Sequence, residues 1–249
     1  MKIVHLSDWH GETKRIPPAD LYVVSGDMLP NFPLIKIQTI RRSNGGIAIH
    51  DPHAHANGKG LPPPNGYYAG RILEPKREET LQREWIAEHP FRSLLGIRDD
   101  VPVVCVRGNH DFTDLSEWFG GNVWEVNLDS SRTTSLFGMK IGGVRGISYI
   151  AGEWSDEMSR AEFVEACASL PNDLDLLITH SPPDGILDEY CGNHCGSRAL
   201  TAYITSRLHT PWIPFRAHFF GHVHESRGES KIQGVVFSNA STNCNIIEL

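Results

Sequence analysis

The sequence predicts a single α/β domain. Five short apolar segments each end at a small cluster of polar residues, as buried strands followed by tight turns do. Helical patterns of apolar residues separate these segments, and strands that alternate with helices are typical of α/β folds. The chain has 249 residues and shows no linker or internal repeat, so residues 1–249 are expected to form one domain.

The predicted strands share an apolar body and a chemically active end, because asparagine, aspartate or histidine follows each of them. In α/β folds, ligands bind outside the carboxyl ends of the strands, so these side chains are the candidates for function. The five predicted strands are 1–6, 21–24, 101–106, 174–179 and 217–220.

The first predicted helix ends near His89 and Pro90, because proline cannot continue the hydrogen-bond ladder. Leu81, Trp85 and Ile86 recur at helical spacing ahead of this proline. That spacing predicts that these three residues share one face of the helix.

Two more helices are predicted from their N-terminal residues. The second starts at Ser159, whose hydroxyl can cap the helix while Glu162 returns the bond, and the third starts at Ser197. A helix start at Ser197 would also present free N–H groups to an anion, so ordinary capping and phosphate binding both stay open there. The apolar residues expected beneath these helices are Phe163, Cys167, Leu170, Leu200, Ile204 and Leu208.

Residues 44–66 break this pattern, with five Gly, four Pro and almost no apolar periodicity. Such a composition predicts a long surface loop, in which His50, Asp51, His53 and His55 are solvated. Because long loops often carry function, a substrate lid is the alternative, and deletion of residues 44–66 should then change substrate preference.

The composition excludes several classes of protein. Hydrophobic residues make up 40% and charged residues 21%, which excludes a collagen, a coiled coil and a mainly disordered chain. The net charge of −7 disfavours a nucleic-acid partner, because an acidic surface repels phosphate backbones. No apolar run reaches the roughly 18 residues of a membrane span, and five cysteines without a repeated pair predict a reducing, cytoplasmic location.

Two predicted strand ends carry carboxylates. Asp8 and His10 stand two apart, so both side chains of an extended segment would face the same side. Gly26 and Asp27 follow the second strand, and the two oxygens of Asp27 could bridge two cations. Alone, each pair is more typical of a turn or a helix cap than of a functional site.

The other strand ends carry histidines. The tetrapeptide Gly108-Asn109-His110-Asp111 is the most specific of these signals, although Asp111 could equally cap a following turn. His180 precedes a segment stiffened by Pro182 and Pro183, and Gly221-His222-Val223-His224 places two histidines at strand spacing. Because all five segments supply oxygen or nitrogen ligands and all follow strands, their combination predicts a metal site.

The order and spacing of these segments resemble the motifs of the calcineurin-like metallophosphoesterase superfamily. The segments that carry the resemblance are 8–10, 26–27, 108–111, 180 and 221–224. The resemblance covers most of the chain. It implies a four-layer α/β/β/α sandwich with two mixed sheets and a two-metal centre at the strand ends. The ligands that it implies for one metal are Asp8, His10, Asp27 and His224. Those for the other metal are Asp27, Asn109, His180 and His222, so that Asp27 bridges the pair.

The resemblance also implies a reaction. Two divalent ions about 3.5–4 Å apart can hold a hydroxide between them for in-line attack on phosphorus. Mn²⁺ is the expected ion, with Fe or Zn²⁺ as alternatives, because all the ligands offer nitrogen or oxygen atoms. His110 is implied as the catalytic residue, a proton donor or charge stabiliser beside the leaving group. We therefore expect a phosphodiesterase that acts on a small or nucleotide-like phosphoester.

The sequence also departs from the superfamily. Many relatives carry a second carboxylate or an asparagine shortly after the bridging aspartate, whereas Asp27 is followed here by Met28, Leu29 and Pro30. The segments 180–183, 196–197 and 239–241 are similar to a small branch associated with phosphodiester and cyclic-nucleotide hydrolysis.

Several alternatives stay open. A phosphomonoesterase or a nuclease of the same fold would use the same ligands, while a non-catalytic protein-binding scaffold would be expected to lack some of them. Cys191, His194 and Cys195 look metal-like, but structural zinc needs four ligands and no second pair is evident. The sequence predicts neither their role, nor the residues that bind substrate, nor the oligomeric state.

Overall fold

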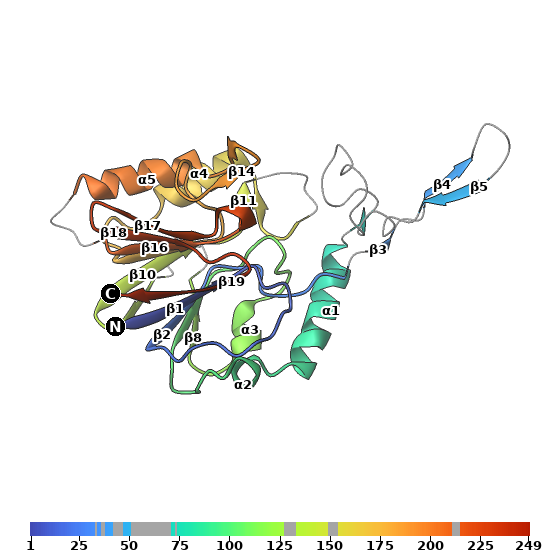
Figure 1. The fold of residues 1–249 in the computed structure, drawn as a ribbon, viewed down its shortest axis with the longest axis horizontal. Helices are drawn as coiled ribbons and strands as arrows, with labels where there is room; N and C mark the ends of the chain where they lie inside the picture. Colours follow the sequence, from blue (N-terminus) through green and yellow to red (C-terminus); the bar gives the residue numbers. More distant parts are fainter. Residues whose placement is uncertain are drawn as a thin grey trace.

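Two large mixed β-sheets face each other at the centre of the molecule, as the computed structural model shows (Figure 1). The structure describes residues 1–32, 34–35, 38–41, 47–50, 71–72, 74–126, 133–148, 154–210 and 215–249. The prediction of an α/β fold with two mixed sheets is confirmed, while the four-layer count stays a prediction.

The first sheet has five strands in the order β19-β1-β2-β7-β8. All neighbours pair in parallel except β19, which runs antiparallel to β1 over its whole length, from Lys2 opposite Glu248 to Ser7 opposite Asn243. The carboxyl ends of β1, β2 and β7 therefore meet at one edge. The strands are β1 (Lys2–Ser7), β2 (Leu21–Val24), β7 (Val103–Cys105), β8 (Val123–Glu125) and β19 (Asn243–Glu248).

The second sheet has six strands in the order β17-β18-β16-β13-β10-β9. Its four central strands are parallel, and an antiparallel strand closes each edge. The strands are β9 (Thr134–Leu136), β10 (Met139–Val144), β13 (Leu176–Thr179), β16 (Ala217–Phe220), β17 (Gly228–Ile232) and β18 (Val235–Asn239).

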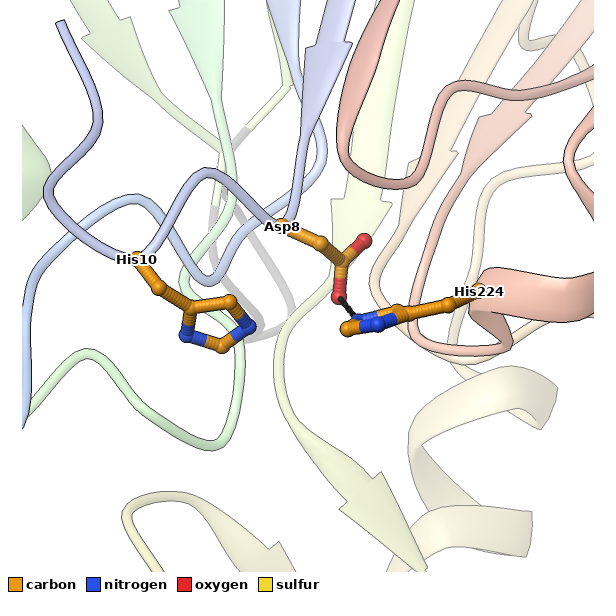
Figure 2. A group of neighbouring side chains, drawn as sticks. All are labelled: Asp8, His10 and His224. Carbon is orange, nitrogen blue, oxygen red and sulfur yellow. Dashed lines mark hydrogen bonds and ion pairs between the residues drawn. The ribbon is translucent and has the colours of Figure 1, made fainter. Parts of the chain in front are cut away.

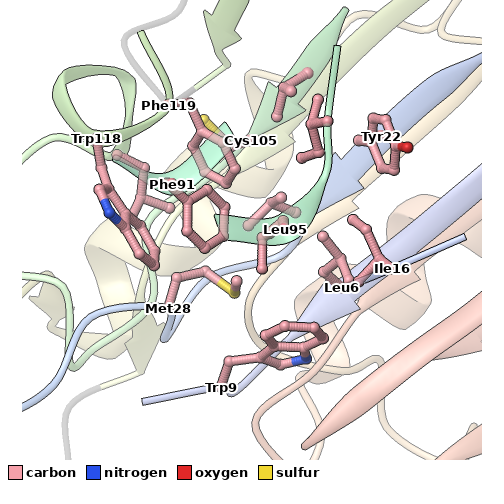
Figure 3. Close-up of a cluster of buried hydrophobic side chains, with 14 of the residues drawn as sticks. Leu6, Trp9, Ile16, Tyr22, Met28, Phe91, Leu95, Cys105, Trp118 and Phe119 are labelled. Carbon is pink, nitrogen blue, oxygen red and sulfur yellow. The ribbon is translucent and has the colours of Figure 1, made fainter. Parts of the chain in front are cut away.

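Three apolar clusters hold the sheets and helices together. One lies between the first sheet and helices α2 (Phe91–Leu95) and α3 (Leu115–Phe119), where Phe91 and Trp118 pack beside strand residues (Figure 3). A second fills the space between the sheets and includes Ile3 and Phe219. The third joins the second sheet to helices α4 (Arg160–Ala168) and α5 (Arg198–Leu208). These contacts fix the two sheets relative to each other, and with them the strand ends.

The three predicted helices are present. In the first of them, the most deeply buried residues are polar. Helix α1 (Pro75–Glu88) ends where the proline predicts, but its fully buried residues are the polar Glu78 and Gln82, while Leu81, Trp85 and Ile86 are half-buried. The cap of α4 is confirmed, since the Ser159 hydroxyl accepts from the Glu162 N–H and the Glu162 carboxylate accepts from the Ser159 N–H. The residues expected beneath α4 and α5 are buried or half-buried in the third cluster.

Four short strand pairs complete the described structure. They are β3 (Leu34–Ile35) with β6 (Arg71–Ile72), β4 (Gln38–Arg41) with β5 (Ile47–His50), β11 (Ile147–Ser148) with β12 (Glu157–Met158), and β14 (Glu189–Tyr190) with β15 (Asn193–His194). None of the helices in these ranges is long and apolar enough to cross a membrane.

The prediction of a loop over residues 44–66 was wrong for four residues. Ile47–His50 form strand β5 and pair with β4, because two isoleucines in alternation favour an extended strand even beside a Gly/Pro-rich segment. The rest of the predicted loop, including Asp51, His53 and His55, lies outside the described residues.

Candidate metal centre

The predicted ligands lie at the carboxyl ends of strands from both sheets. In the first sheet, Asp8 and His10 follow β1, Asp27 follows β2, and Asn109 follows β7. In the second sheet, His180 follows β13, while His222 and His224 follow β16. Parallel strands deliver their ends to one edge, so residues far apart in the sequence meet there.

Backbone hydrogen bonds join the turns after β1 and β2. The Asp8 N–H donates to the Gly26 carbonyl at 3.0 Å, and the His10 N–H donates to the Asp27 carbonyl at 3.0 Å. The two turns therefore form one unit, in which the first two carboxylates keep a fixed separation.

Four of the site residues adopt the left-handed backbone conformation that non-glycine residues rarely use. The φ angles are +57° at Asp8, +46° at His10, +54° at Asp27 and +70° at His222. Such a conformation costs of order 1 kcal/mol per residue and persists where the surroundings enforce it, which is common at functional sites. Here it turns successive side chains toward the cluster.

Two glycines allow the backbone to approach the carboxylates closely. A Cβ atom on Gly108 would overlap the Asp27 carboxylate, and one on Gly221 would overlap the Ser7 hydroxyl and the Asp8 carboxylate. Glycine is thus required at both positions by contact with the ligands.

Three overlapping groups of donor atoms lie at this edge, each within 4.8 Å, and each could hold a metal ion. In the first, the Asp8 carboxylate points at the His224 ring, with His10 on the other side (Figure 2). Asp27 belongs to both other groups. The members of the three groups are Asp8, His10 and His224; His10, Asp27 and His110; and Asp27, His180 and His222.

Asp8 is held by donors on one oxygen and faces the cluster with the other. Its Oδ2 accepts from the Ser7 and Ser241 hydroxyls at 2.6 and 2.9 Å and from the His222 N–H at 2.9 Å. Its Oδ1 lies 3.2 Å from His224 Nε2. Burial would raise the pKa of Asp8, but the hydrogen bond from His224 and the charge of His180 outweigh burial and lower it.

Asp27 is oriented in the same way. Its Oδ1 accepts from the His110 N–H at 2.7 Å, and its Oδ2 lies 3.2 Å from His180 Nε2. Burial opposes ionisation of Asp27, yet the neighbouring histidines, His180 first, hold its pKa well below the usual range. Both carboxylates are therefore charged and buried, which is stable only beside positive charge.

His180 shows most clearly how the site suits a cation. Its Nδ1 donates to the Ser25 carbonyl at 2.7 Å, which leaves Nε2 to face Asn109 Oδ1 at 3.0 Å and Asp27. Metal-binding histidines are usually oriented by such a second hydrogen bond. Burial lowers the pKa of His180, but Asp27 and Asp8 more than offset this and raise it to about 9. The carboxylates thus attract positive charge to this nitrogen, as they would attract a divalent ion.

His110 is a member of the second donor group and also contacts residues outside the three groups. Its Nε2 lies 3.9 Å from Asp27 Oδ2, and its ring lies 4.6 Å from the His10 ring and 4.4 Å from the Trp154 ring, between centroids. Its Nδ1 makes a short hydrogen bond with Asn31 Oδ1, while the Asn31 amide also donates to the His110 carbonyl at 3.1 Å.

Asn31 corrects the expectation that neither a carboxylate nor an asparagine follows Asp27 closely. Many relatives carry an asparagine shortly after the bridging aspartate, and this chain has one at position 31, directly after Met28, Leu29 and Pro30. Its position directly after Pro30 is the signal that would have identified it. Its contact with His110 depends on the fold, because residue 31 approaches residue 110 across two loops.

Asp111 supports the backbone of the site. Its carboxylate accepts from the N–H groups of Asp27 and Gly108 on one oxygen, at 2.7 and 2.9 Å, and from those of Met28 and Leu29 on the other, at 2.9 and 3.0 Å. The question of whether Asp111 caps a turn or serves the site is thereby answered, since it ties the turn after β2 to the turn after β7. Burial and the charge of Asp27 raise its pKa to about 7.

Two other sequence signals lie apart from these donor groups. His194 Nδ1 bonds to the Asp188 carboxylate at 2.8 Å, and Cys191 and Cys195 are exposed free thiols. Among the described residues, none of the three belongs to a group that could hold a metal. The Ser197 hydroxyl accepts from the Leu200 N–H, so it caps α5.

Comparisons with known proteins place this geometry in context. Residues 1–226 match the family model described as calcineurin-like phosphoesterase. A UPF0046 protein of Caenorhabditis elegans is 33% identical over 112 residues, which are 45% of this chain and 34% of that protein. The match thus spans about a third of the relative's length.

A solved structure is also similar. It belongs to a Staphylococcus aureus protein provisionally named a 5'-nucleotidase, crystallised with alpha-ketoglutarate. The TM-score is 0.44 at 10% sequence identity, and the alignment covers 97% of this chain and 48% of that one.

Proposed function

This chain belongs to the calcineurin-like phosphoesterase family, and from that premise we propose that it is a metal-dependent phosphodiesterase acting on small or nucleotide-like esters. The observation that carries the proposal is the convergence of two buried aspartates and five histidines from five strand ends into donor groups within 4.8 Å. Carboxylates and imidazoles gathered in this way suit divalent ions.

We propose two ions with a shared ligand. Asp8, His10 and His224 would hold one, Asn109, His180 and His222 the other, and Asp27 would bridge them; the contacts of Asp27 with histidines on both sides support this division. Mn²⁺ is the ion we propose first, with Fe or Zn²⁺ as alternatives, since all donors are nitrogen or oxygen. When bound, such ions supply Lewis acidity and lower the pKa of water, so that hydroxide is available at neutral pH.

His110 is proposed as the proton donor to the leaving-group oxygen. Asn31 Oδ1 accepts the Nδ1 proton, which turns Nε2 toward the side of the ring where Asp27 lies. Burial lowers the pKa of His110 to about 4, and the charge of Asp27 opposes that shift. A phosphoester anion beside the ring adds to the charge of Asp27, so we expect the protonated ring in the substrate complex.

The surroundings of Arg107 favour a diester over a monoester. Arg107 directly precedes the Gly108-Asn109-His110 segment, but its guanidinium pairs with Asp114 at 3.1 Å and Asp156 at 3.0 Å. Its positive charge is therefore neutralised. A monoester carries up to two negative charges at neutral pH and a diester one, so a site next to which Arg107 is already paired suits the diester.

A hydrolysis panel tests the substrate class and the metal together. Chelator-stripped protein, reloaded with Mn²⁺, Fe or Zn²⁺ one at a time, is assayed on mono-, di- and cyclic phosphoesters. We expect no turnover without metal and faster turnover of diesters than of monoesters with Mn²⁺. Faster turnover of monoesters would overturn the diester assignment, and inactivity on every ester with every metal would leave a binding role in place of the enzyme.

Two substitutions separate metal binding from proton donation. Asp27→Ala should lose both metal content and turnover, whereas His110→Ala should retain the metals and lose about 10²- to 10⁴-fold in kcat. The exposed Asp20→Ala and His209→Ala are matched controls outside the site and should behave as wild type. Metal content is measured by elemental analysis. Full activity in either site variant would refute its assigned role.

A further inference from the structure

The two most deeply buried residues of helix α1 are polar. Glu78 and Gln82, one turn apart, are fully buried, with 0% of each residue exposed. Polar side chains are rarely buried to this extent unless hydrogen bonds use their atoms. These two side chains form hydrogen bonds with backbone groups in the loops that carry Asn31 and His110.

Gln82 uses both ends of its side-chain amide on these loops. Its Nε2 donates to the His110 carbonyl at 2.7 Å and to the Pro30 carbonyl at 3.0 Å. Its Oε1 accepts from the Phe112 N–H at 2.7 Å. One amide thus holds the backbone of the proposed proton donor and the backbone directly before Asn31.

Glu78 extends the same contact by one residue. Its Oε2 accepts from the Phe32 N–H at 2.7 Å, on the far side of Asn31 from Pro30. The residues that flank Asn31 are therefore both fixed to α1, and Asn31 itself contacts His110 through its ring and its carbonyl.

We propose that Gln82 is a positioning residue that sets where the His110 imidazole points. The inference rests on the proposed function, because it assumes that His110 donates a proton. Gln82 joins the two loops into one rigid piece, so the hydrogen bond between Asn31 and the ring forms at a fixed place. A displacement of about 1 Å in a reacting group can reduce a rate about 10²-fold.

Gln82→Glu is the sharpest variant, because it keeps the shape of the side chain. It replaces the Nε2 donor by a carboxylate oxygen that faces two carbonyl oxygens, so the loops should separate. Glu84→Gln, the reverse exchange on the exposed side of α1, is the matched control and should behave as wild type.

The readout is the dependence of kcat on the leaving group, measured on the Mn²⁺-loaded protein with an aryl and an alkyl phosphodiester. A nitrophenolate leaves without protonation, while an alkoxide needs the donor. We expect Gln82→Glu to lose about 10- to 100-fold in kcat on the alkyl ester and less than about 3-fold on the aryl ester. KM and metal content should stay unchanged. A general loss of structure would instead reduce both rates together.

A double variant ties the effect to His110. If Gln82 acts through the ring, adding Gln82→Glu to His110→Ala should cause no further loss, because the two residues act as one unit. Additive losses would overturn the proposal, as would equal losses on both esters or unchanged rates in Gln82→Glu. If that variant does not fold, Gln82→Met removes the same hydrogen bonds with an apolar side chain of similar length.

A measurement without turnover separates this inference from the proposed function. In NMR spectra of the protein loaded with Zn²⁺, which is diamagnetic, the His110 Nδ1 proton should be protected from solvent exchange in wild type and exchange at least 10-fold faster in Gln82→Glu. Equal exchange would overturn the positioning role even in an inactive protein. Wild-type inactivity with faster exchange in the variant would overturn the proposed function alone.

Discussion

At the scale of single residues, the contacts of the candidate ligands differ from those of the side chains that support the turns. Asp8 and Asp27 each use one oxygen for hydroxyl or N–H donors and turn the other toward histidines. Asp111 uses both oxygens for backbone N–H groups. A carboxylate that accepts four such bonds is saturated, so it stabilises the turns and is not available as a ligand.

The convergence of the candidate ligands could be predicted because each sits in a short motif directly after an apolar strand. Asn31 and Asp111 could not, since their roles depend on which loops approach each other. The Asp111 carboxylate accepts from backbone N–H groups of residues 27 to 29, and Asn31 forms a hydrogen bond with the His110 ring. These partners are far apart in the sequence, so no local sequence pattern predicts the contacts. The division of ligands between two metals is still a prediction.

His218 offers a test of buried charge away from the metal centre. Because the Thr179 hydroxyl donates to the Ser181 carbonyl, it accepts from His218 Nε2 at 2.8 Å, while in the described part of the chain His218 Nδ1 has no hydrogen-bond partner. Burial lowers the pKa of His218 to about 3, with a smaller contribution from His5. The ring is therefore neutral in the folded protein.

The sign of the pH dependence follows directly. The pKa of His218 in the folded protein lies below its unfolded value of about 6.5, so the unfolded state binds a proton more readily than the folded state. The free energy of unfolding therefore decreases as the pH falls from about 6.5 toward 3. Between pH 7.5 and pH 5, we expect wild type to lose about 2 kcal/mol more unfolding free energy than His218→Gln. Urea unfolding at both pH values measures this. Equal losses would show that His218 is not the group responsible.

At the scale of elements, the strands that are buried at every position were predicted, whereas several strands with half-buried or exposed positions were not. The strands β2, β7, β13 and β16 are continuous buried runs, which the sequence shows as apolar segments. Strand β17 reads Gly-Glu-Ser-Lys-Ile and alternates between half-buried and exposed positions. It forms because it pairs with the edge of β18, a contact that its own weak sequence pattern cannot predict.

Helix α1 was predicted from its apolar spacing, but its polar contacts were not predicted. Trp85 and Ile86 pack against the first apolar cluster, while Glu78 and Gln82 meet backbone groups of two loops. Polar side chains then suit the contact better than apolar ones.

The cap of α4 gives a prediction about a single element. Ser159→Ala removes the hydroxyl that accepts from the Glu162 N–H, so the free energy of unfolding should fall by about 1 kcal/mol while kcat is unchanged. Ser169→Ala, at the other end of α4, removes a bond to the Glu165 carbonyl and should change stability by less than about 0.5 kcal/mol. Denaturant titration compares the two. A larger effect of Ser169→Ala would contradict the capping argument.

At the scale of the whole molecule, the donor groups join the two sheets. Asp8, His10 and Asp27 come from the first sheet, and His180, His222 and His224 come from the second. Bound metal would therefore act as a cross-link between the sheets, in addition to the apolar cluster between them.

Metal should consequently stabilise the fold. A ligand at 100 times its Kd adds about 2.7 kcal/mol, and for a chain of this size each kcal/mol raises Tm by about 2–4 °C. We expect Mn²⁺ to raise the Tm of chelator-stripped protein by about 5–10 °C, and Asp27→Ala to remove that rise. Calorimetry measures both. An equal rise in Asp27→Ala would place the ion elsewhere.

The pairing of β19 with β1 also bears on how the molecule is made. Asp8 receives a hydrogen bond from Ser241, 233 positions later in the chain, and β19 completes the sheet edge beside it. Ribosomes add about 5–20 residues per second, so about 12–47 s separate the synthesis of these two residues. Throughout that interval the nascent chain carries its first acidic and imidazole groups without their partners. We expect the candidate centre to bind metal ions only after β19 has been translated.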